Sequence, residues 1–309
     1  MRRGIADVGS NSLLLVVAER VGETWQEITE TSVVTGLGAG TKQTRLLSQD
    51  AIKRTLEALA AAKRDADSLG AELFSFGTMA LRIADNRDEF LCRAREQNTP
   101  VTVLSGEEEA TLGALAVLED PAFAGETSIT VLDIGGHSTE VSCHELRGGR
   151  WECLSSASIP IGTLALRYGA LSDESPDAGE LLRASREIDA EVERFVPNGF
   201  QGKAVALGAS ATNLVTVRDS IVPWDASRVH LADLSFEEVS RFAGGLSRLG
   251  DAGRRALVGI EPGRETTLHI GALLLERLLY ALRVERCTVS TKGWRHAMLG
   301  RVEEHFGGP

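Results

Sequence analysis

Two short segments of the same form, far apart in the chain, constrain the fold more than any other feature. Asp7-Val8-Gly9-Ser10-Asn11-Ser12 and Asp133-Ile134-Gly135-Gly136-His137-Ser138 share the pattern Asp, Val or Ile, Gly, Ser or Gly, any residue, Ser, and they lie 126 residues apart. Each follows a short apolar stretch and precedes a second one, as the turn of a β-hairpin does. Two such hairpins indicate two related domains, which we expect to face each other across a cleft.

The rest of the chain alternates between strand-like and helix-like segments, which predicts an α/β fold. We expect strands at 4–7, 13–17, 25–28, 31–35, 73–76, 101–104, 129–132, 140–143, 151–157, 203–207 and 286–290. We expect helices at 88–97, 107–117, 180–195 and 265–282, a helix that begins after the N-cap Ser48 and stops at Gly70, and a capping box from Ser235 to Glu238. The Pro- and Gly-containing stretch 119–126 predicts a boundary, which gives domains 1–122 and 123–309, the last helix being able to pack back on the first domain.

Length and apolar patterning limit the class of protein. The chain of 309 residues has room for about two domains. The longest apolar run near the N-terminus, 13–18, is far shorter than the ~20 residues of a membrane span. No apolar stretch with a small-residue cleavage site precedes it, so we expect no signal peptide. The four cysteines form no CxxC pair and are typical of reduced thiols. We therefore predict a cytoplasmic protein with no membrane partner.

The charge balance bears on the ligand. The net charge of −11 argues against a broad nucleic-acid-binding surface, so no nucleic-acid partner is expected. A phosphate ligand remains compatible with this charge, because backbone N–H groups in tight turns, helix N-termini and a bound metal ion all bind phosphate.

The repeated turn has the chemistry of a phosphate and metal site. An Asp at the end of a strand offers a carboxylate to a divalent cation, and the Gly two residues later lets backbone N–H groups approach a ligand. One such turn alone is most often an ordinary β-turn. Two of them at matching places in two domains favour a shared phosphate ligand.

The chain resembles the exopolyphosphatase/guanosine pentaphosphate phosphatase family, within the actin-like, sugar-kinase-like ATPase superfamily. Besides the two hairpins, the segments that carry this resemblance are Gly77-Thr78-Met79-Ala80-Leu81-Arg82-Ile83-Ala84-Asp85-Asn86, Leu104-Ser105-Gly106-Glu107-Glu108-Glu109-Ala110, Ile159-Pro160-Ile161-Gly162 and Leu207-Gly208-Ala209-Ser210-Ala211-Thr212. The length is similar to that of the short members. The resemblance implies two actin-like (ribonuclease H-like) domains with mixed sheets flanked by helices and an interdomain cleft.

Two positions depart from the family pattern. His137 stands where the family has the third glycine of DIGGGSTE, and Gly293-Trp294-Arg295-His296-Ala297 stands where it has GLRxG. A side chain at 137 either crowds the phosphate loop or, when protonated, adds a donor to it. Both departures leave the carboxylates in place and bear on catalytic rate and substrate preference.

The resemblance implies roles for the acidic and basic residues. Asp7 and Asp133 would face Mg²⁺ (or Mn²⁺), and the plain alternative is a pair of Asx-turns. Glu109 would be the general base, with Glu108 as a substitute, although acidic residues in a first helical turn often only stabilise the helix dipole. Glu140 would orient water or metal, against the alternative of a solvated strand end, and Arg82 would grip phosphate oxygens, against that of a surface ion pair.

Small and polar residues would complete the phosphate contacts. They are Ser10, Asn11, Ser12, Gly135, Gly136, His137, Ser138, Thr139, Gly208 and Ser210. The remaining histidines, 144, 230, 269, 296 and 305, have no metal-ligand spacing and are interpreted as structural.

The expected activity is Mg²⁺-dependent release of terminal orthophosphate from inorganic polyphosphate by direct attack of water. One alternative is 5′-phosphate hydrolysis of guanosine pentaphosphate, which would connect the protein to the stringent response. A second is a polyphosphate-binding protein with little turnover, motivated by His137 and Ala297, and a third is an ATP-dependent kinase of the same superfamily. A homodimer is a family expectation.

Overall fold

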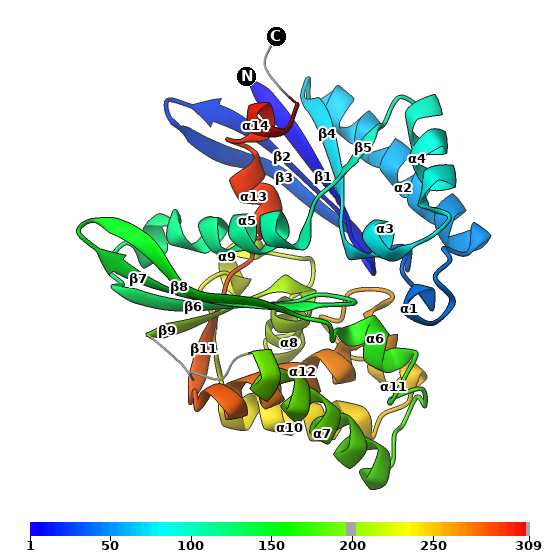
Figure 1. Ribbon diagram of the computed structural model, residues 1–309, viewed down its shortest axis with the longest axis vertical. Coiled ribbons are helices and arrows are strands. Elements are labelled where there is room, and N and C mark those ends of the chain that lie inside the picture. The colour runs from blue at the N-terminus through cyan, green and yellow to red at the C-terminus, as the bar shows by residue number, and fades with distance from the viewer. Residues whose placement is uncertain (196–201, 307–309) are drawn as a thin grey trace. The chain divides into compact units, whose positions relative to one another are not determined.

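The computed structural model describes residues 1–195 and 202–306 (Figure 1). It divides into two compact units. Unit 1 holds Met1–Ala116 together with the chain from Trp294 onward, and unit 2 holds Val117–Gly293. The end of the chain therefore groups with unit 1, and the passage from unit 1 to unit 2 falls in the last turns of a helix, α5 (Gly106–Leu118).

Unit 1 is built on a five-stranded sheet of order β3-β2-β1-β4-β5. Its strands are β1 (Arg2–Val8), β2 (Ser12–Val21), β3 (Thr24–Val34), β4 (Glu72–Gly77) and β5 (Val101–Val103). Its helices are α1 (Thr41–Thr44), α2 (Gln49–Ser68), α3 (Met79–Ile83), α4 (Arg87–Glu96), most of α5, α13 (Trp294–Met298) and α14 (Val302–Phe306). One face of the sheet packs on α2 and α4, and the other packs on α5 and α13.

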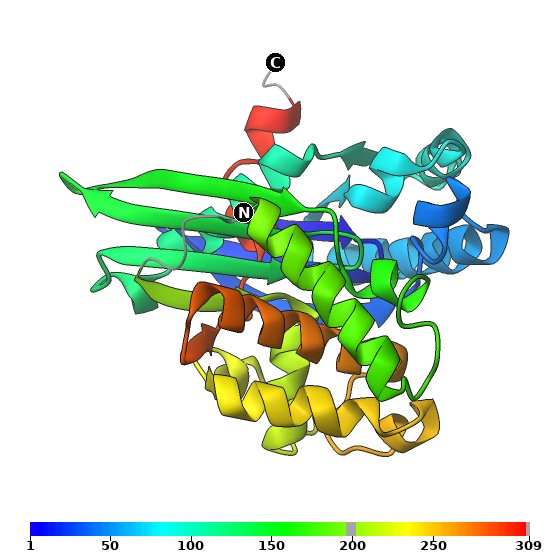
Figure 2. The same ribbon diagram turned by 60° about the horizontal axis from the view of Figure 1, so that its bottom comes forward.

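Unit 2 is built on a six-stranded sheet of order β10-β11-β9-β6-β7-β8. Its strands are β6 (Ser128–Ile134), β7 (Thr139–Arg147), β8 (Arg150–Ile159), β9 (Lys203–Leu207), β10 (Asp233–Ser235) and β11 (Arg286–Val289). Its helices are α6 (Thr163–Arg167), α7 (Ala178–Phe195), α8 (Gly208–Arg218), α9 (Ala226–Val229), α10 (Phe236–Ser247), α11 (Asp251–Arg255) and α12 (Leu268–Leu282), with the 3₁₀ helices η1 (Pro121–Phe123) and η2 (Arg264–Thr266). Helices α7, α10 and α12 run side by side over one face of the sheet, as both views show (Figures 1 and 2).

The two sheets repeat one topology. β1 pairs antiparallel with β2 and parallel with β4, and β6 pairs antiparallel with β7 and parallel with β9. Asp7 lies opposite Leu14 in unit 1, and Asp133 lies opposite Glu140 in unit 2, so the two hairpins share one register at the offset seen in the sequence. The mixed, helix-flanked sheets confirm the predicted fold class.

Local sequence explains several helix ends. The Ser48 hydroxyl accepts the N–H of Ala51 as the N-cap of α2, and Gly70, just beyond the end of α2, has a φ of +65°, which favours glycine. The capping box of α10 joins Ser235 and Glu238 as predicted.

Two predicted elements need correction. The strands expected at 25–28 and 31–35 are one strand, β3, with a bulge at Ile28. The helix expected to begin at Glu265 begins at Leu268, because Glu265 lies in η2, where its carboxylate pairs with Arg255 and accepts the N–H of Gly263.

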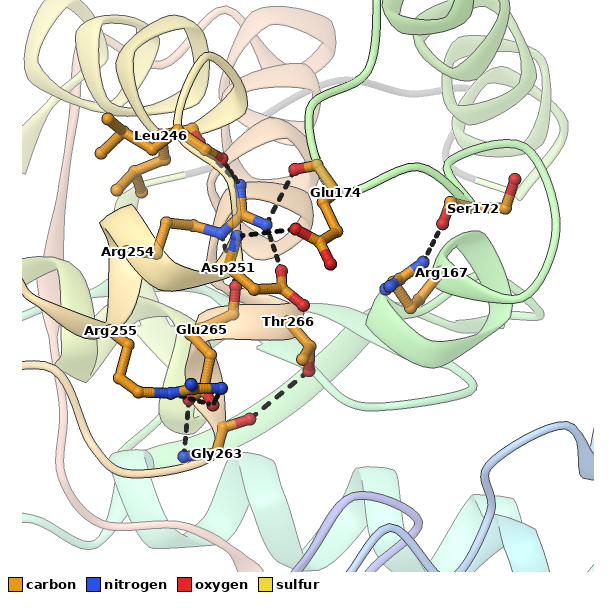
Figure 3. Close-up of polar contacts among 11 residues, drawn as sticks. Arg167, Ser172, Glu174, Leu246, Asp251, Arg254, Arg255, Gly263, Glu265 and Thr266 are labelled. Atoms are coloured by element: carbon orange, nitrogen blue, oxygen red, sulfur yellow. Dashed lines mark hydrogen bonds and ion pairs between the residues drawn. The ribbon is translucent and has the colours of Figure 1, made fainter.

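A buried arginine ties several segments of unit 2 together (Figure 3). Arg254 is 0% exposed and donates to the backbone carbonyl oxygens of Leu246 and Glu174, each at 2.9 Å, as well as to that of Glu265. Its guanidinium also pairs with Asp251 at 2.5 Å. The charge is thus compensated inside the protein, as a buried ion requires.

None of the described helices combines the length and the apolar character that crossing a membrane requires.

Candidate functional site

The turns of the two hairpins have the same backbone geometry. The N–H of Gly9 donates to Ser12 O at 2.9 Å, and the N–H of Gly135 donates to Ser138 O at 3.0 Å. A Cβ atom would lie 2.8 Å from Ser12 O at position 9 and 2.9 Å from Ser138 O at position 135. These contacts are too short for a side chain, so both turns require glycine.

The segment that follows β8 orients the peptide groups of the second turn. Thr163 donates its N–H to Gly135 O at 3.1 Å, and Leu164 donates to Gly136 O at 2.7 Å. In a trans peptide the N–H points opposite to the C=O of the preceding residue. The N–H groups of Gly136 and His137 are therefore directed away from α6, in the way that an anion-binding turn presents them.

The segment that follows β3 does the same for the first turn. Gly38 donates its N–H to Ser10 O at 2.7 Å, and both Thr35 and Gly36 donate to Asn11 O. The amide nitrogen Nδ2 of Asn11 is buried and has no hydrogen-bond partner within the described residues. A buried donor of this kind is costly unless a ligand or water satisfies it, so it suits a phosphate oxygen.

The predicted turn motif 159–162 supports the second loop from behind. A Cβ atom at Gly162 would lie 2.6 Å from the carbonyl carbon of Gly136, so the backbone at 162 packs directly against the loop. The Thr139 hydroxyl donates to Ile161 O at 2.7 Å. The hydroxyl proton of Thr139 is thus directed to a backbone carbonyl, and Thr139 and its neighbour Ser138 are both buried.

Asp133 lies where β6 ends beside the start of α8. Asp133 pairs with Leu207, and Gly208 follows with a φ of +85°. A Cβ atom at 208 would lie 3.1 Å from Asp133 Oδ1, so glycine leaves room around the carboxylate. Ser210 packs against α12, because a Cβ atom at Gly271 would lie 2.3 Å from Ser210 Oγ. A phosphate contact from position 210 would therefore use its backbone N–H.

Glu140 is the cross-strand neighbour of Asp133. Directly opposite residues of an antiparallel pair share a face, with Cβ atoms about 4.5–5.5 Å apart. Glu140 is buried, and its Oε1 accepts a hydrogen bond from Ser158 Oγ at 2.8 Å. Two carboxylates thus lie side by side in unit 2.

Asp7 shares its surroundings in unit 1 with a residue whose role the sequence did not reveal. Asp7 is buried at the end of β1. Burial lowers the pKa of the Arg295 guanidinium, whereas the charges of Asp7 and Glu27 raise it, and Arg295 forms an ion pair with Glu30. The segment 293–297 was noted for its departure from a family motif, and Arg295 within it was the available signal.

Arg82 and Glu109 form an ion pair at the edge where β4 and β5 end. Arg82 Nη1 donates to Glu109 Oε2 at 2.8 Å and to Leu104 O at 2.9 Å. Burial raises the pKa of Glu109, and the charge and hydrogen bond of Arg82 oppose that rise. A carboxylate whose pKa is raised by burial is a stronger proton acceptor than an exposed one.

The neighbouring residue, Glu108, caps a helix. Glu108 Oε2 accepts the N–H of Ser105 at 2.7 Å, while Ser105 Oγ accepts the N–H of Glu108 at 3.1 Å. This is a reciprocal capping box at the start of α5. Of the two candidate bases, Glu109 is the one that is not used to cap the helix.

His137 is only 1% exposed. The imidazole is therefore buried and is not reached by solvent. Ser10 and Ser12, on the matching turn of unit 1, are also buried. Asn11 is buried as well, and its Nδ2 is the donor of this turn that has no partner within the described residues.

The donors present fit a hard divalent cation. Asp7 and Asp133 offer carboxylate oxygens, the ligands that Mg²⁺ prefers. The free space that Gly208 leaves beside Asp133 Oδ1 is of the kind that a bound ion needs.

The residues that the sequence singled out thus fall into two groups. In unit 1 the first turn with Asp7 is joined through Thr78, whose N–H donates to Val8 O at 3.4 Å, to the segment that carries Arg82. In unit 2 Asp133, Glu140, Gly208 and the second turn form one continuous group. Each group joins a strand-end carboxylate to an amide-lined turn.

The comparison with known proteins agrees with this arrangement. Residues 16–306 match the model of the Ppx/GppA phosphatase family. Exopolyphosphatase 2 of Mycobacterium tuberculosis is 28% identical over 92% of this chain and 93% of its own. The crystal structure of the Aquifex aeolicus member of the family is 25% identical, covers 100% of this chain and 99% of its own, and has a TM-score of 0.77.

A more distant structure shows the fold. The structure of an exopolyphosphatase from Cytophaga hutchinsonii is 20% identical, covers 99% of this chain and 98% of its own, and has a TM-score of 0.86. Together with the family match over nearly the whole length, these findings establish that the chain belongs to the Ppx/GppA phosphatase family.

Proposed function

We propose that the protein is an exopolyphosphatase, which hydrolyses the terminal phosphoanhydride bond of inorganic polyphosphate with the help of Mg²⁺. The observation that carries this proposal is the duplicated turn. In each unit a strand-end carboxylate precedes a glycine turn whose carbonyls are held by hydrogen bonds, so that backbone N–H groups are available to phosphate oxygens. The similarity to Exopolyphosphatase 2 of Mycobacterium tuberculosis supports the choice of substrate.

Each group of residues would contribute donors for phosphate oxygens. In unit 2 these would be the N–H groups of Gly136 and His137, and in unit 1 the donor would be Asn11 Nδ2. Preorganised donors of this type stabilise the charge of the transferring phosphoryl group. Asp7 and Asp133 would hold Mg²⁺, which supplies further charge neutralisation when bound.

Glu109 would accept the proton of the attacking water. Arg82 holds Oε2 of its carboxylate, so Oε1 is the oxygen that would take the proton. Burial raises the pKa of Glu109, which makes it a stronger base than an exposed glutamate. Glu140, beside Asp133, would orient a water molecule or the metal.

The direct test is orthophosphate release by the purified chain from long polyphosphate, short polyphosphate and guanosine pentaphosphate, each with and without Mg²⁺. We expect Mg²⁺-dependent release from polyphosphate. Faster release from guanosine pentaphosphate would reassign the substrate while keeping the reaction. Tight polyphosphate binding with no release in Mg²⁺ or Mn²⁺ would refute the enzymatic proposal in favour of a binding protein.

A further inference from the structure

We propose that unit 1 holds a transition-metal site, separate from the phosphate turns and suited to Zn²⁺, formed by Glu27, Glu30 and His296. One carboxylate oxygen of each glutamate and one ring nitrogen of the histidine all lie within 4.8 Å of one another. The glutamates come from β3 and the histidine from α13, which are at opposite ends of the chain. The inference does not depend on the proposed activity.

A β-bulge places the two glutamates on one face of the sheet. Side chains three residues apart in a regular strand point to opposite faces. Here Val17 pairs with Thr29 and Ala18 pairs with Glu27, so Ile28 is an extra residue in β3 and the alternation shifts by one. Bulges often re-aim a side chain towards a site.

The face that they share is the one that α13 covers. Glu30 lies opposite Val16, and Glu27 lies opposite Ala18. Both partners belong to the apolar cluster that contains Trp294 and Met298 of α13. His296 belongs to the same helix, and its Nε2 contacts Oε2 of Glu27.

The distance between His296 and Glu27 is that expected of two ligands of one ion. His296 Nε2 and Glu27 Oε2 are 3.4 Å apart. Two ligands about 2.0–2.1 Å from a tetrahedral Zn²⁺ lie about 3.3–3.4 Å from each other. The ligand oxygen of Glu30 lies within 4.8 Å of both these atoms. A small side-chain movement would bring it to the same ion.

Burial and charge also suit a bound cation. The side chains of Glu30 and His296 are 8% and 11% exposed, whereas that of Glu27 is 39% exposed and offers a path from solvent. Arg295 pairs with Glu30, which is the outer-shell contact that ligating carboxylates commonly have. Two carboxylates and one guanidinium leave a net negative charge for the ion.

The ligand types select the metal. One imidazole nitrogen with two carboxylate oxygens suits Zn²⁺ and related first-row ions, whereas Mg²⁺ prefers oxygen ligands alone. A bound ion would join β3 to α13 and thereby fasten the last part of the chain to unit 1. Since such an ion binds the folded state, it should also raise the stability of the protein.

The test uses the full chain, stripped of metal with a chelator and titrated with Zn²⁺ by calorimetry. We expect Glu27→Gln and His296→Asn to remove one Zn²⁺ per chain from the binding stoichiometry or to weaken its binding at least ~10-fold, since even the loss of an outer-shell partner weakens a metal site by about that factor. Glu23→Gln, in the exposed turn between β2 and β3, is the matched control and should bind as the wild type does. Asp133→Asn should also keep this ion. The variant thereby distinguishes Zn²⁺ at the proposed site from any Zn²⁺ bound at the phosphate turns.

A second measurement covers variants that fold poorly. Zn²⁺ should raise the thermal midpoint of the wild type and of Glu23→Gln, and it should raise that of Glu27→Gln much less. If Glu27→Gln and His296→Asn keep both the stoichiometry and the midpoint shift of the wild type, the proposal is wrong. Glu27 then only contacts His296, and Glu30 only pairs with Arg295.

Discussion

Arg82 Nη1 is shared between the carboxylate of Glu109, at 2.8 Å, and the backbone carbonyl of Leu104, at 2.9 Å. The guanidinium thus fixes the glutamate to the end of β5. An arginine interpreted from the sequence as a grip for phosphate is, in the structure, also the residue that positions the proposed base.

Glu109→Gln should lower kcat for polyphosphate hydrolysis by at least ~10²-fold, the contribution typical of a general base. Affinity for polyphosphate should be unchanged or slightly higher, because a negative charge has been removed. Steady-state orthophosphate release and a separate binding measurement check both parts. Glu108→Gln is the control, and it should cost little because a glutamine oxygen can still accept the N–H of Ser105. A larger loss in Glu108→Gln would move the base to position 108.

Arg82→Met should shift the acidic limb of the kcat/KM profile to higher pH. Burial raises the pKa of Glu109 and Arg82 opposes this, so loss of the guanidinium raises the pKa further. The base is then protonated, and inactive, at a pH where the wild type still works. Arg82→Lys keeps a positive charge and should shift the limb less. If the acidic limb stays at the same pH in both variants, it does not reflect the pKa of Glu109.

Asp133→Asn should abolish Mg²⁺-dependent turnover and leave the thermal midpoint close to that of the wild type. The amide keeps the size of the side chain but carries no charge to hold a hard cation. Orthophosphate release over a series of Mg²⁺ concentrations measures the effect, with the exposed Asp173→Asn as control. Normal turnover at saturating Mg²⁺ would contradict the assignment of Asp133.

His269→Leu should make the protein more resistant to acid. His269 is 1% exposed in the first turn of α12, and burial, with the charges of Arg254 and Arg167, lowers its pKa to about 3. The unfolded chain has a histidine pKa of about 6.5, so it binds a proton that the folded state refuses. Wild-type stability is therefore lost as the pH falls from about 6.5 towards about 3, and the leucine variant avoids that loss.

Urea unfolding of both proteins at several pH values tests this. The difference in unfolding free energy should move in favour of His269→Leu as the pH falls below about 6.5. A difference that does not change with pH would mean that folding does not lower the pKa of His269.

His137→Gly should lower the free energy of unfolding by about 2–4 kcal/mol while phosphate release persists at low temperature. The imidazole is buried, so its removal leaves a cavity and adds backbone freedom. The loop carbonyls remain held by α6, so its N–H groups keep their orientation. If activity disappears while the fold survives, the imidazole itself contacts the substrate.

The repeated hairpins could be predicted because they are local. A strand, a glycine turn and a second strand leave a pattern in adjacent residues, and the shared register of Asp7 and Asp133 follows from it. The bulge at Ile28 left no such pattern, because it depends on how β3 packs on β2. The burial of Arg254 could not be predicted either, since the carbonyls that receive it come from segments far apart in sequence.

The sequence could predict which residues belong to the candidate site, but it could predict the role of each residue less well. Glu108 and Glu109 were both open as the base, although Ser105 three residues before Glu108 already matched a capping box. The pairing of Arg82 with Glu109 and the approach of Arg295 to the acidic residues of unit 1 arise from tertiary packing. The spacing of these residues along the chain does not indicate either contact.

The register shared by the two hairpins also allows the two halves to be compared position by position. Leu14 occupies in the first hairpin the place that Glu140 holds in the second, and Asn11 corresponds to His137. Gly9 and Gly135 agree, as do Asp7 and Asp133, whereas the other two compared positions carry different side chains. This pattern is expected if the two hairpins arose by duplication, kept a common backbone and then acquired different side chains. Each hairpin would then have a role that the other cannot perform.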